Sequence, residues 1–542
     1  MEVAAGVFAL LLGVVLSGIG SRATRVPVPL VQIALGAAIH SSGLVAIDLD
    51  PEVFFLVLLP PLLFLDGWRI PKDDLVRDAP TILTLALGLV VFTVLGVGVF
   101  LHWLVPALPL PVAFALAAVI SPTDPIAVSA IASRTPMPLR MRRLLEGESL
   151  FNDASALVCM RFAVTAALTG LFSVQDALLN FAWVALGGLA LGAGLTWMVT
   201  MAQSWSSAPA SDGGGAQILT TLLIPSTVYL LAEYLHCSGI LAAVAAGITM
   251  GLTPHTHWKA TTRIRRTAVW DTVQFAANGS VFVLLGAQIP SIVAAAPATV
   301  VQTGHTSPWW LLVYVVLVVL ALATLRFAWV WVSIRLAFLR PGPDGRTLPA
   351  SYQRLVLAMS LAGVRGAITL AGVLTLPLTL ANGLRFPGRD LAICLAAGVI
   401  VLSLVLASVA LPHTLRGLVL PADPRQPGAE NKARTAAAEA AVHGVLQAVE
   451  SLPRRPEQRV LYEHASLRIA ANYRQRLDQY ADDDAAFLAP GTMDAIEREL
   501  RIAGLRAERE ELLSSAGSHG VKDIVVRKLV REVDLQEARY TS

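Results

Sequence analysis

Two carboxylates inside apolar stretches are the residues best suited to chemistry in this chain. Asp153 lies in the middle of the apolar stretch 144–168, and Asp124 lies between Pro122 and Pro125 in the stretch before it. An ionisable group at the centre of a bilayer costs roughly 2.5–3.5 kcal/mol or more, so packing alone seldom explains it. The two prolines disfavour regular helix hydrogen bonding around Asp124. Buried charge and broken backbone at one depth are typical of proteins that move ions across membranes.

Polar side chains next to Asp153 supply further oxygen atoms. Ser149 precedes Asp153 by four residues and shares its helix face, and Glu148 and Asn152 share the adjoining face by the same spacing. Oxygen ligands suit small hard cations, and a carbonyl group freed at the proline break, such as that of Thr123, would complete an oxygen cage. The sequence therefore predicts a cation and proton site from five residues: Asp153, Asp124, Ser149, Thr123 and Asn152.

An arginine in a later apolar stretch supplies the opposite charge. Arg365 lies in the middle of 354–379 and is flanked by Gly363 and Gly366. A buried arginine needs an acidic partner, because an uncompensated buried charge costs several kcal/mol. Glu148 is the acid available at this depth, so we predict a buried ion pair between Glu148 and Arg365. A structural role for the pair is favoured over a switching role.

Other polar residues in apolar stretches have weaker signals. Asp66 lies near the end of the third apolar stretch, where an interfacial position and a role at the cation entrance are both open. Arg161 is expected to extend toward a polar boundary, and Glu233 to be interfacial. Asn278 is interpreted as an interhelix hydrogen-bonding residue.

The composition places these residues in a membrane protein. Of the 542 residues, 55% are hydrophobic and 15% are charged, against about 25% charged in soluble domains. The net charge of +3 is small and argues against a nucleic-acid partner. The three cysteines lie in apolar runs and are interpreted as core residues rather than metal ligands or disulfides.

Apolar runs of membrane-spanning length follow one another through the first three quarters of the chain. About twenty apolar residues cross a bilayer core, and we expect about 13 such helices. The runs lie at 3–20, 27–43, 52–66, 79–103, 108–132, 144–170, 178–202, 216–235, 238–253, 268–292, 308–336, 354–379 and 389–416. Basic residues gather in alternate loops, for example in 134–143 and 259–266, whereas loop 44–52 has none. Because basic loops stay in the cytoplasm, we predict an outer amino terminus and a cytoplasmic carboxyl terminus.

The last part of the chain has a different character. We divide the chain into a transmembrane domain, 1–419, and a cytoplasmic helical domain, 420–542. The second part is rich in Ala, Glu and Arg, with helical periodicity at 433–450, 458–480, 492–515 and 520–538. It has no phosphate loop or nucleotide fingerprint, so no cofactor and no enzyme activity are expected. A solvated helical domain is favoured over a ligand sensor.

Four stretches together resemble the monovalent cation–proton antiporter superfamily, in its sodium/proton exchanger branch. They are Ser121-Pro122-Thr123-Asp124-Pro125, Glu148 to Asp153, Ala232-Glu233 with Ser238-Gly239-Ile240-Leu241-Ala242, and Gly363-Val364-Arg365-Gly366-Ala367. They are spread over residues 1–416, and the tail lies outside the shared part.

The resemblance implies an all-α fold of two inverted repeats, in which the broken fifth and twelfth helices cross near the midplane. Asp153 would bind cation and proton alternately, with Asp124, Ser149 and the Thr123 carbonyl as further ligands and Glu148–Arg365 as the ion pair. The resemblance further implies a homodimer in the plasma membrane, which is the inner membrane of a bacterium. In relatives, an asparagine directly before the aspartate, as Asn152 is before Asp153, accompanies electroneutral exchange. Many relatives carry an acid where this chain has Leu65. Asp66 follows one residue later, which turns its side chain by about 100° on a helix.

We therefore predict a secondary-active, electroneutral antiporter that exchanges Na⁺ or Li⁺ for H⁺ by competition at Asp153. A K⁺/H⁺ antiporter on the same scaffold is the first alternative, because selectivity depends on cage size and ligand number. An intramembrane aspartyl protease and a channel are remote alternatives. The protease's characteristic Tyr-Asp and Gly-x-Gly-Asp patterns do not surround Asp124 or Asp153.

Overall fold

The structure is a computed structural model of the whole chain. It describes residues 2–418 apart from 44–52, 71–86, 133–136, 170–173, 206–214, 254–259, 340–351 and 381–382. Beyond residue 418 it describes short pieces, the longest of which are helical at 439–447 and 464–471. The chain divides into two compact units, Met1–Leu420 and Pro421–Ser542. This division falls one residue from the predicted domain boundary.

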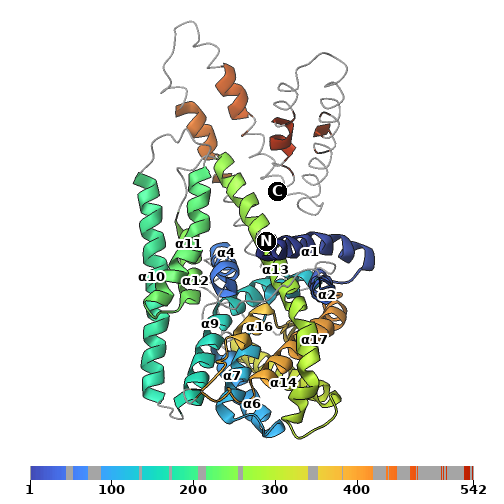
Figure 1. Ribbon diagram of the computed structural model, residues 1–542. Coiled ribbons are helices and arrows are strands. Elements are labelled where there is room, and N and C mark those ends of the chain that lie inside the picture. The colour runs from blue at the N-terminus through green and yellow to red at the C-terminus, as the bar shows by residue number, and fades with distance from the viewer. Residues whose placement is uncertain are drawn as a thin grey trace. The chain divides into compact units, whose positions relative to one another are not determined.

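Long apolar helices dominate the first unit. Among the described residues, seven helices are long and apolar enough to cross a membrane. They are α1 (Glu2–Thr24), α9 (Leu139–Thr169), α10 (Val174–Trp205), α11 (Gly215–Tyr234), α13 (Ala260–Val301), α14 (Trp309–Leu339) and α17 (Arg389–Leu415) (Figure 1). Shorter apolar helices are α2 (Val28–Ser41), α6 (Leu89–Leu104), α7 (Leu110–Ile120) and α12 (Gly239–Leu252). The predicted all-α membrane fold is confirmed.

Each apolar run predicted from the sequence overlaps a described helix or pair of helices, although residues 79–86 of the fourth run lie outside the described part of the chain. The third run forms a π-helical stretch, η1 (Phe54–Leu58), continued by α4 (Leu59–Arg69). Pro60 and Pro61 come just after this π-helical stretch. Proline cannot donate the regular helical hydrogen bond, so the change from π- to α-helical pairing lies next to the two prolines. Loop 44–52 and most of the predicted tail helices lie outside the described residues.

Two helices are broken where the sequence predicts it. The fifth run consists of α7 and α8 (Pro125–Ala132), separated by residues 121–124, and the twelfth consists of α15 (Tyr352–Leu361) and α16 (Ala367–Leu374). The backbone N–H of Asp124 donates to the carbonyl of Val364 at 2.8 Å. The two breaks therefore touch, and four half-helix ends meet at one place.

Glycines allow two reciprocal helix pairs to pack with their backbones in contact. A Cβ atom at Gly36 of α2 would lie 2.0 Å from the carbonyl oxygen of Val283 in α13, and one at Gly286 of α13 would lie 2.1 Å from that of Ile33 in α2. Gly67 of α4 and Gly247 of α12 approach each other's helices in the same way. The second and third segments of one half thus pair with the third and second segments of the other, a reciprocal arrangement that agrees with two inverted repeats.

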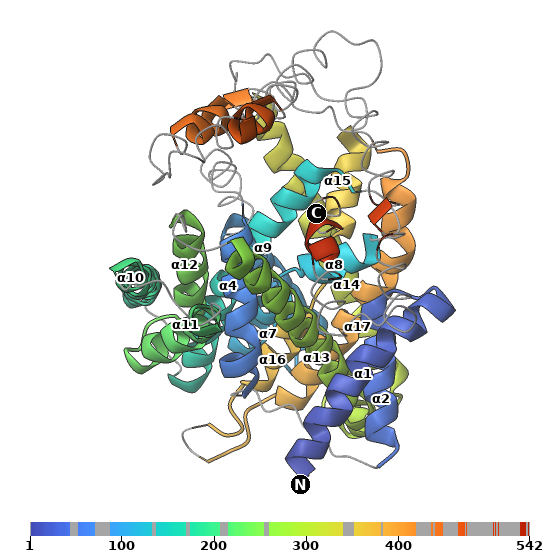
Figure 2. The ribbon, with the colours of Figure 1, turned by 90° about the horizontal axis from the view of Figure 1, so that it is seen from above.

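The remaining helices surround the two breaks. Figures 1 and 2 show α10, α11 and α12 grouped at one side of the first unit, and α1 and α2 beside α13. The largest buried apolar cluster draws most of its residues from α6, α7, α14 and α17, together with the broken helices. This core packs against the half-helices, and residues of their polar breaks line a cavity.

Candidate functional site

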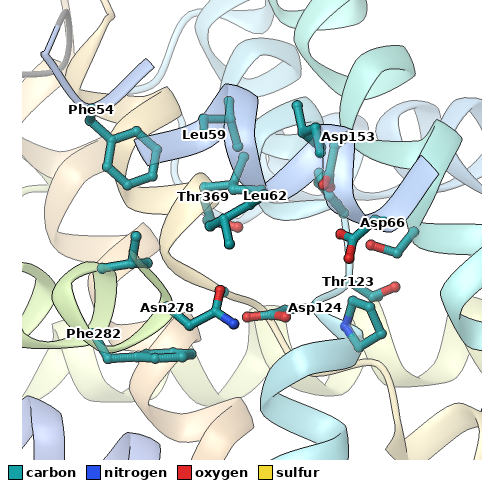
Figure 3. Close-up of a pocket in the computed structure, with 17 residues that line it drawn as sticks. Phe54, Leu59, Leu62, Asp66, Thr123, Asp124, Asp153, Asn278, Phe282 and Thr369 are labelled. Atoms are coloured by element: carbon teal, nitrogen blue, oxygen red, sulfur yellow. The ribbon is translucent and has the colours of Figure 1, made fainter. Parts of the chain in front are cut away.

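A cavity of about 50 Å³ lies beside the crossed breaks. This is room for an ion with a small number of water molecules. The cavity is lined by Phe54, Leu59, Leu62, Leu63, Asp66, Pro122, Thr123, Asp124, Pro125, Ser149, Asp153, Asn278, Val281, Phe282, Gly366, Ile368 and Thr369 (Figure 3). Of the five residues predicted to bind the cation and proton, four line this cavity, and Asn152 does not.

Three carboxylates face the cavity. Asp124 comes from the break before α8, Asp153 from the middle of α9, and Asp66 from the end of α4. Figure 3 shows their oxygen atoms around the same space. The one-residue offset of Asp66 from its usual position in the family therefore does not remove it from the site. Asp66 thus lines the cavity, and its role at a cation entrance stays a prediction.

Asp124 is held by helix ends. Its Oδ1 accepts a hydrogen bond from the backbone N–H of Ala127 at 3.2 Å, so it caps the start of α8. Its carboxylate also lies against the start of α16, where a Cβ atom at Gly366 would be 2.4 Å from Oδ2. Helix amino termini carry partial positive charge. Two of them therefore stabilise the negative charge of Asp124.

The negative charge of Asp153 is not stabilised by helix ends in this way. Asp153 is buried, with 6% of its surface exposed, and no described residue donates a hydrogen bond to its carboxylate. Ser149, one turn earlier on α9, is equally buried at the cavity wall. A buried carboxylate without a partner is unfavourable as an anion. The geometry thus leaves the neutralisation of Asp153 to a proton or a cation that enters the cavity.

Asn152 contacts the break in the fifth segment and does not line the cavity. Its amide nitrogen donates to Thr123 Oγ1 at 3.1 Å, and that hydroxyl donates to Glu148 Oε1 at 3.2 Å. Asn152 therefore connects α9 to the break in the fifth segment, away from the cavity. Because the Thr123 hydroxyl is engaged with Glu148 and Asn152, the group that Thr123 could offer an ion is its carbonyl.

The buried ion pair of Glu148 also differs from the prediction. Arg326 of α14 forms it, with distances of 2.5 Å between Nη1 and Oε1 and 3.0 Å between Nη2 and Oε2. Exposure of the two side chains is 2% and 0%. The predicted partner, Arg365, is wrong, because depth along a helix does not tell which helix lies opposite. Sequence inspection missed Arg326, although it is the sole charged residue between 309 and 334.

Arg365 instead binds backbone carbonyls at the crossing. Its Nε donates to the carbonyl of Ile120 at 2.9 Å, and Nη1 donates to that of Gly363. Ile120 is the last residue of α7, and Gly363 lies two residues beyond the end of α15. One guanidinium group thus satisfies a carbonyl at each break, next to helix carboxyl termini that carry partial negative charge.

A further ion pair joins α9 to the segment α11–α12. Arg161 Nη2 lies 3.1 Å from Glu233 Oε1, and the same oxygen accepts from the backbone N–H of Gly239 at 3.2 Å. Both side chains are partly exposed, with 53% and 33% exposure, and each has the other as its partner. The residues are 72 positions apart, so no local pattern could pair them.

Crossed broken helices beside buried carboxylates in a helical membrane bundle define a class of proteins, the ion-carrying membrane transporters. Comparison with known proteins supports this class. A family model described as sodium/hydrogen exchanger, transmembrane, matches residues 7–417. The chain belongs to the sodium/hydrogen exchanger family, whose members are transporters and not enzymes. The aspartyl protease alternative is therefore wrong.

Two relatives and one solved structure illustrate the similarity. The chain is 37% identical over 99% of both chains to the uncharacterised Na⁺/H⁺ exchanger YjcE of Escherichia coli (strain K12). It is 42% identical to the sodium, potassium, lithium and rubidium/H⁺ antiporter of Bacillus pumilus, over 76% of this chain and 61% of that protein. The fold is similar to that of the sodium proton antiporter MjNhaP1 from Methanocaldococcus jannaschii, with a TM-score of 0.58 at 19% identity over 77% of this chain and 99% of that one.

Proposed function

We propose that this protein exchanges monovalent alkali cations for protons by competition at Asp153. The observation that carries the proposal is the setting of that side chain. It is a buried carboxylate in a cavity beside two helix breaks, without a hydrogen-bond donor among the described residues. A proton and a cation each neutralise it, and they exclude each other. Asp124, Ser149 and the Thr123 carbonyl act as further cation ligands, and Asp66 receives the ion at the entrance.

Alternating access follows from the same charge balance. With either ligand bound, Asp153 is neutral, and the site can change its exposure from one side of the membrane to the other. The empty carboxylate stays a buried anion, which disfavours crossing without a ligand. Movement of one ion down its gradient then drives the other in the opposite direction.

The cation is proposed to be Na⁺ or Li⁺, with K⁺ and Rb⁺ as further substrates. Two Bacillus relatives, 42% and 35% identical to this chain, carry names that specify sodium, potassium, lithium and rubidium. The oxygen ligands around the cavity suit all four ions, because each is a hard cation. K⁺/H⁺ exchange, the first alternative from the sequence, is thus proposed as one activity of a protein with a broad range of cation substrates. We further propose a homodimer in the bacterial plasma membrane, with an outer amino terminus and a cytoplasmic carboxyl terminus.

Replacement of Asp153 by Asn tests the proposal. We expect Asp153→Asn to lose cation-dependent proton flux in proteoliposomes, because the amide can bind neither a titrating proton nor a cation by charge. The measurement is dequenching of a pH-sensitive dye on addition of each cation. Size-exclusion chromatography shows whether the variant is folded. A folded variant with substantial Na⁺-driven flux would contradict the role of Asp153.

Exchange should be electroneutral, with one cation for one proton. Asp153 is the sole group that we propose to change its ligand during the cycle, and Asn152 adds no titrating charge beside it. Transport is measured at several membrane potentials, which are clamped with an ionophore for an ion that the protein does not carry. A Na⁺/H⁺ exchange rate that is independent of voltage is the expected result. An equilibrium that shifts with voltage would exclude 1:1 stoichiometry.

A further inference from the structure

The cavity lies between two sets of helices. One wall comes from the crossed breaks and α9, and it contributes Pro122, Thr123, Asp124, Pro125, Ser149, Asp153, Gly366, Ile368 and Thr369. The opposite wall comes from η1, α4 and α13, and it contributes Phe54, Leu59, Leu62, Leu63, Asp66, Asn278, Val281 and Phe282. Six of these eight side chains are apolar. Asp66 and Asn278 are thus the polar lining residues of the second wall.

The backbone beneath Asn278 is tightly held. The next residue, Gly279, lies against α1 and α2, where a Cβ atom would be 2.4 Å from the side chain of Val14 and 3.0 Å from that of Gln32. Two turns later Gly286 contacts the backbone of α2 at Ile33. Val281 and Phe282 follow at the spacing that shares a helix face with Asn278. Asn278 therefore projects into the cavity from a rigid part of α13.

The amide of Asn278 has no hydrogen-bond partner within the described part of the chain, although the sequence analysis expected an interhelix bond. Figure 3 shows its side chain directed across the cavity toward Asp124. An amide offers a carbonyl oxygen as an ion ligand and carries no charge. It can therefore add a ligand to the site without altering the charge balance of one-for-one exchange.

We propose that the Asn278 side-chain oxygen is a cation ligand supplied by the α13 wall, and that it determines which alkali ions the site prefers. This role rests on the antiport function proposed above. Discrimination among cations depends on cavity size, ligand number and ligand rigidity. Removal of the Asn278 amide takes away an oxygen atom and widens the cavity on the α13 side. A small ion such as Li⁺ or Na⁺ then cannot contact oxygen atoms across the wider space, whereas a larger ion can.

Asn278→Ala and Gln274→Ala form a matched pair of variants for the test. Gln274 is an amide one turn earlier on α13, where it accepts a hydrogen bond from Arg69 at 2.7 Å, and it does not line the cavity. Apparent KM values for Li⁺, Na⁺, K⁺ and Rb⁺ are measured by dye dequenching in proteoliposomes. In Asn278→Ala we expect KM to rise about tenfold for Li⁺ and Na⁺ and less than about threefold for Rb⁺. Gln274→Ala should keep the ranking of the wild-type protein.

A second measurement covers the case in which Asn278→Ala folds but does not transport. The rise in melting temperature on addition of each cation reports binding to the purified protein without any flux. A smaller rise with Li⁺ and Na⁺, and an unchanged rise with Rb⁺, supports the proposal. An equal change for all cations, or no change, overturns it. Asp153→Asn separates the two ideas: retained exchange there refutes the antiport site itself, whereas an unaltered ranking in Asn278→Ala refutes the role of Asn278 alone.

Discussion

Asp153, Asp124 and Glu148 carry the same functional group, and their neighbours make them different. Glu148 is neutralised by Arg326, and Asp124 is stabilised by the starts of α8 and α16. Asp153 has neither kind of partner among the described residues. Burial penalises a charge unless it is paired or hydrogen-bonded. The cavity carboxylate of Asp66 likewise has no hydrogen-bond partner among the described residues, so our proposal that Asp153 exchanges its ligand rests on its position beside both breaks as well as on its lack of a fixed partner.

Glu148 and Arg326 should behave as a coupled pair. Glu148→Ala and Arg326→Ala each leave a buried charge unpaired, so each should lower the free energy of unfolding by about 3–5 kcal/mol. The double variant should lose less than the sum of the two. Thermal or denaturant unfolding in detergent measures this double-mutant cycle.

The control for this cycle is an exposed pair on the same helix. Arg142 and Glu146 of α9 lie 2.8 Å apart at i and i+4, with exposures of 56% and 38%. Breaking that pair should change stability by less than about 0.5 kcal/mol. Strict additivity at Glu148 and Arg326 would show that the two side chains do not interact.

At the scale of elements, the site depends on helices that stop in mid-membrane. The backbone groups freed at the breaks form hydrogen bonds. The N–H of Asp124 donates to the carbonyl of Val364, and the carbonyls of Ile120 and Gly363 accept from the Arg365 side chain. Non-helical backbone is tolerated at membrane depth where it is buried in protein or lines a cavity. The crossing therefore supplies the dipoles that hold Asp124, and it requires helices packed closely enough to keep the ends in place.

Two glycines of α10 test the importance of close helix contact. A Cβ atom at Gly192 would lie 2.0 Å from the carbonyl oxygen of Ala242 in α12, whereas one at Gly194 meets nothing within 4 Å. Gly192→Ala should separate α10 from α12 and lower the melting temperature. Gly194→Ala should be neutral or stabilise by up to about 1 kcal/mol, because alanine favours helix over glycine. Equal effects of the two substitutions on melting would contradict this packing.

At the scale of the whole molecule, the chain divides into two compact units. The cavity, the crossed helices and both ion pairs formed by α9 with other helices lie within Met1–Leu420. The second unit, Pro421–Ser542, has nearly balanced acidic and basic residues. We expect it to modulate transport rather than perform it, by biasing the equilibrium between transporter states.

A chain that ends at Leu420 should therefore still exchange Na⁺ for H⁺. Its apparent cation affinity or its pH profile should differ from that of the full chain, because the bias from the second unit is removed. Both proteins are compared in proteoliposomes after size-exclusion chromatography. A well-folded truncated protein without transport at any pH would show that the second unit belongs to the transport machinery.

Several features followed from the sequence because they depend on local chemistry. Apolar length predicted the membrane helices, since the bilayer thickness fixes how many apolar residues must follow one another. Pro122 and Pro125 predicted one helix break, whereas the break in the twelfth segment was expected from the family resemblance. Asp124 and Asp153 were identified as site residues because an isolated acid in an apolar run is costly wherever its helix lies.

The tertiary structure decided which of these groups meet. Arg326 rather than Arg365 pairs with Glu148, Arg161 pairs with Glu233, and Asn278 faces the cavity. Each of these outcomes depends on the rotation and neighbours of whole helices, which are set by glycine contacts and apolar packing far along the chain. A position within a helix fixes the depth and face of a side chain. The group that it meets there is fixed by the helix on the other side.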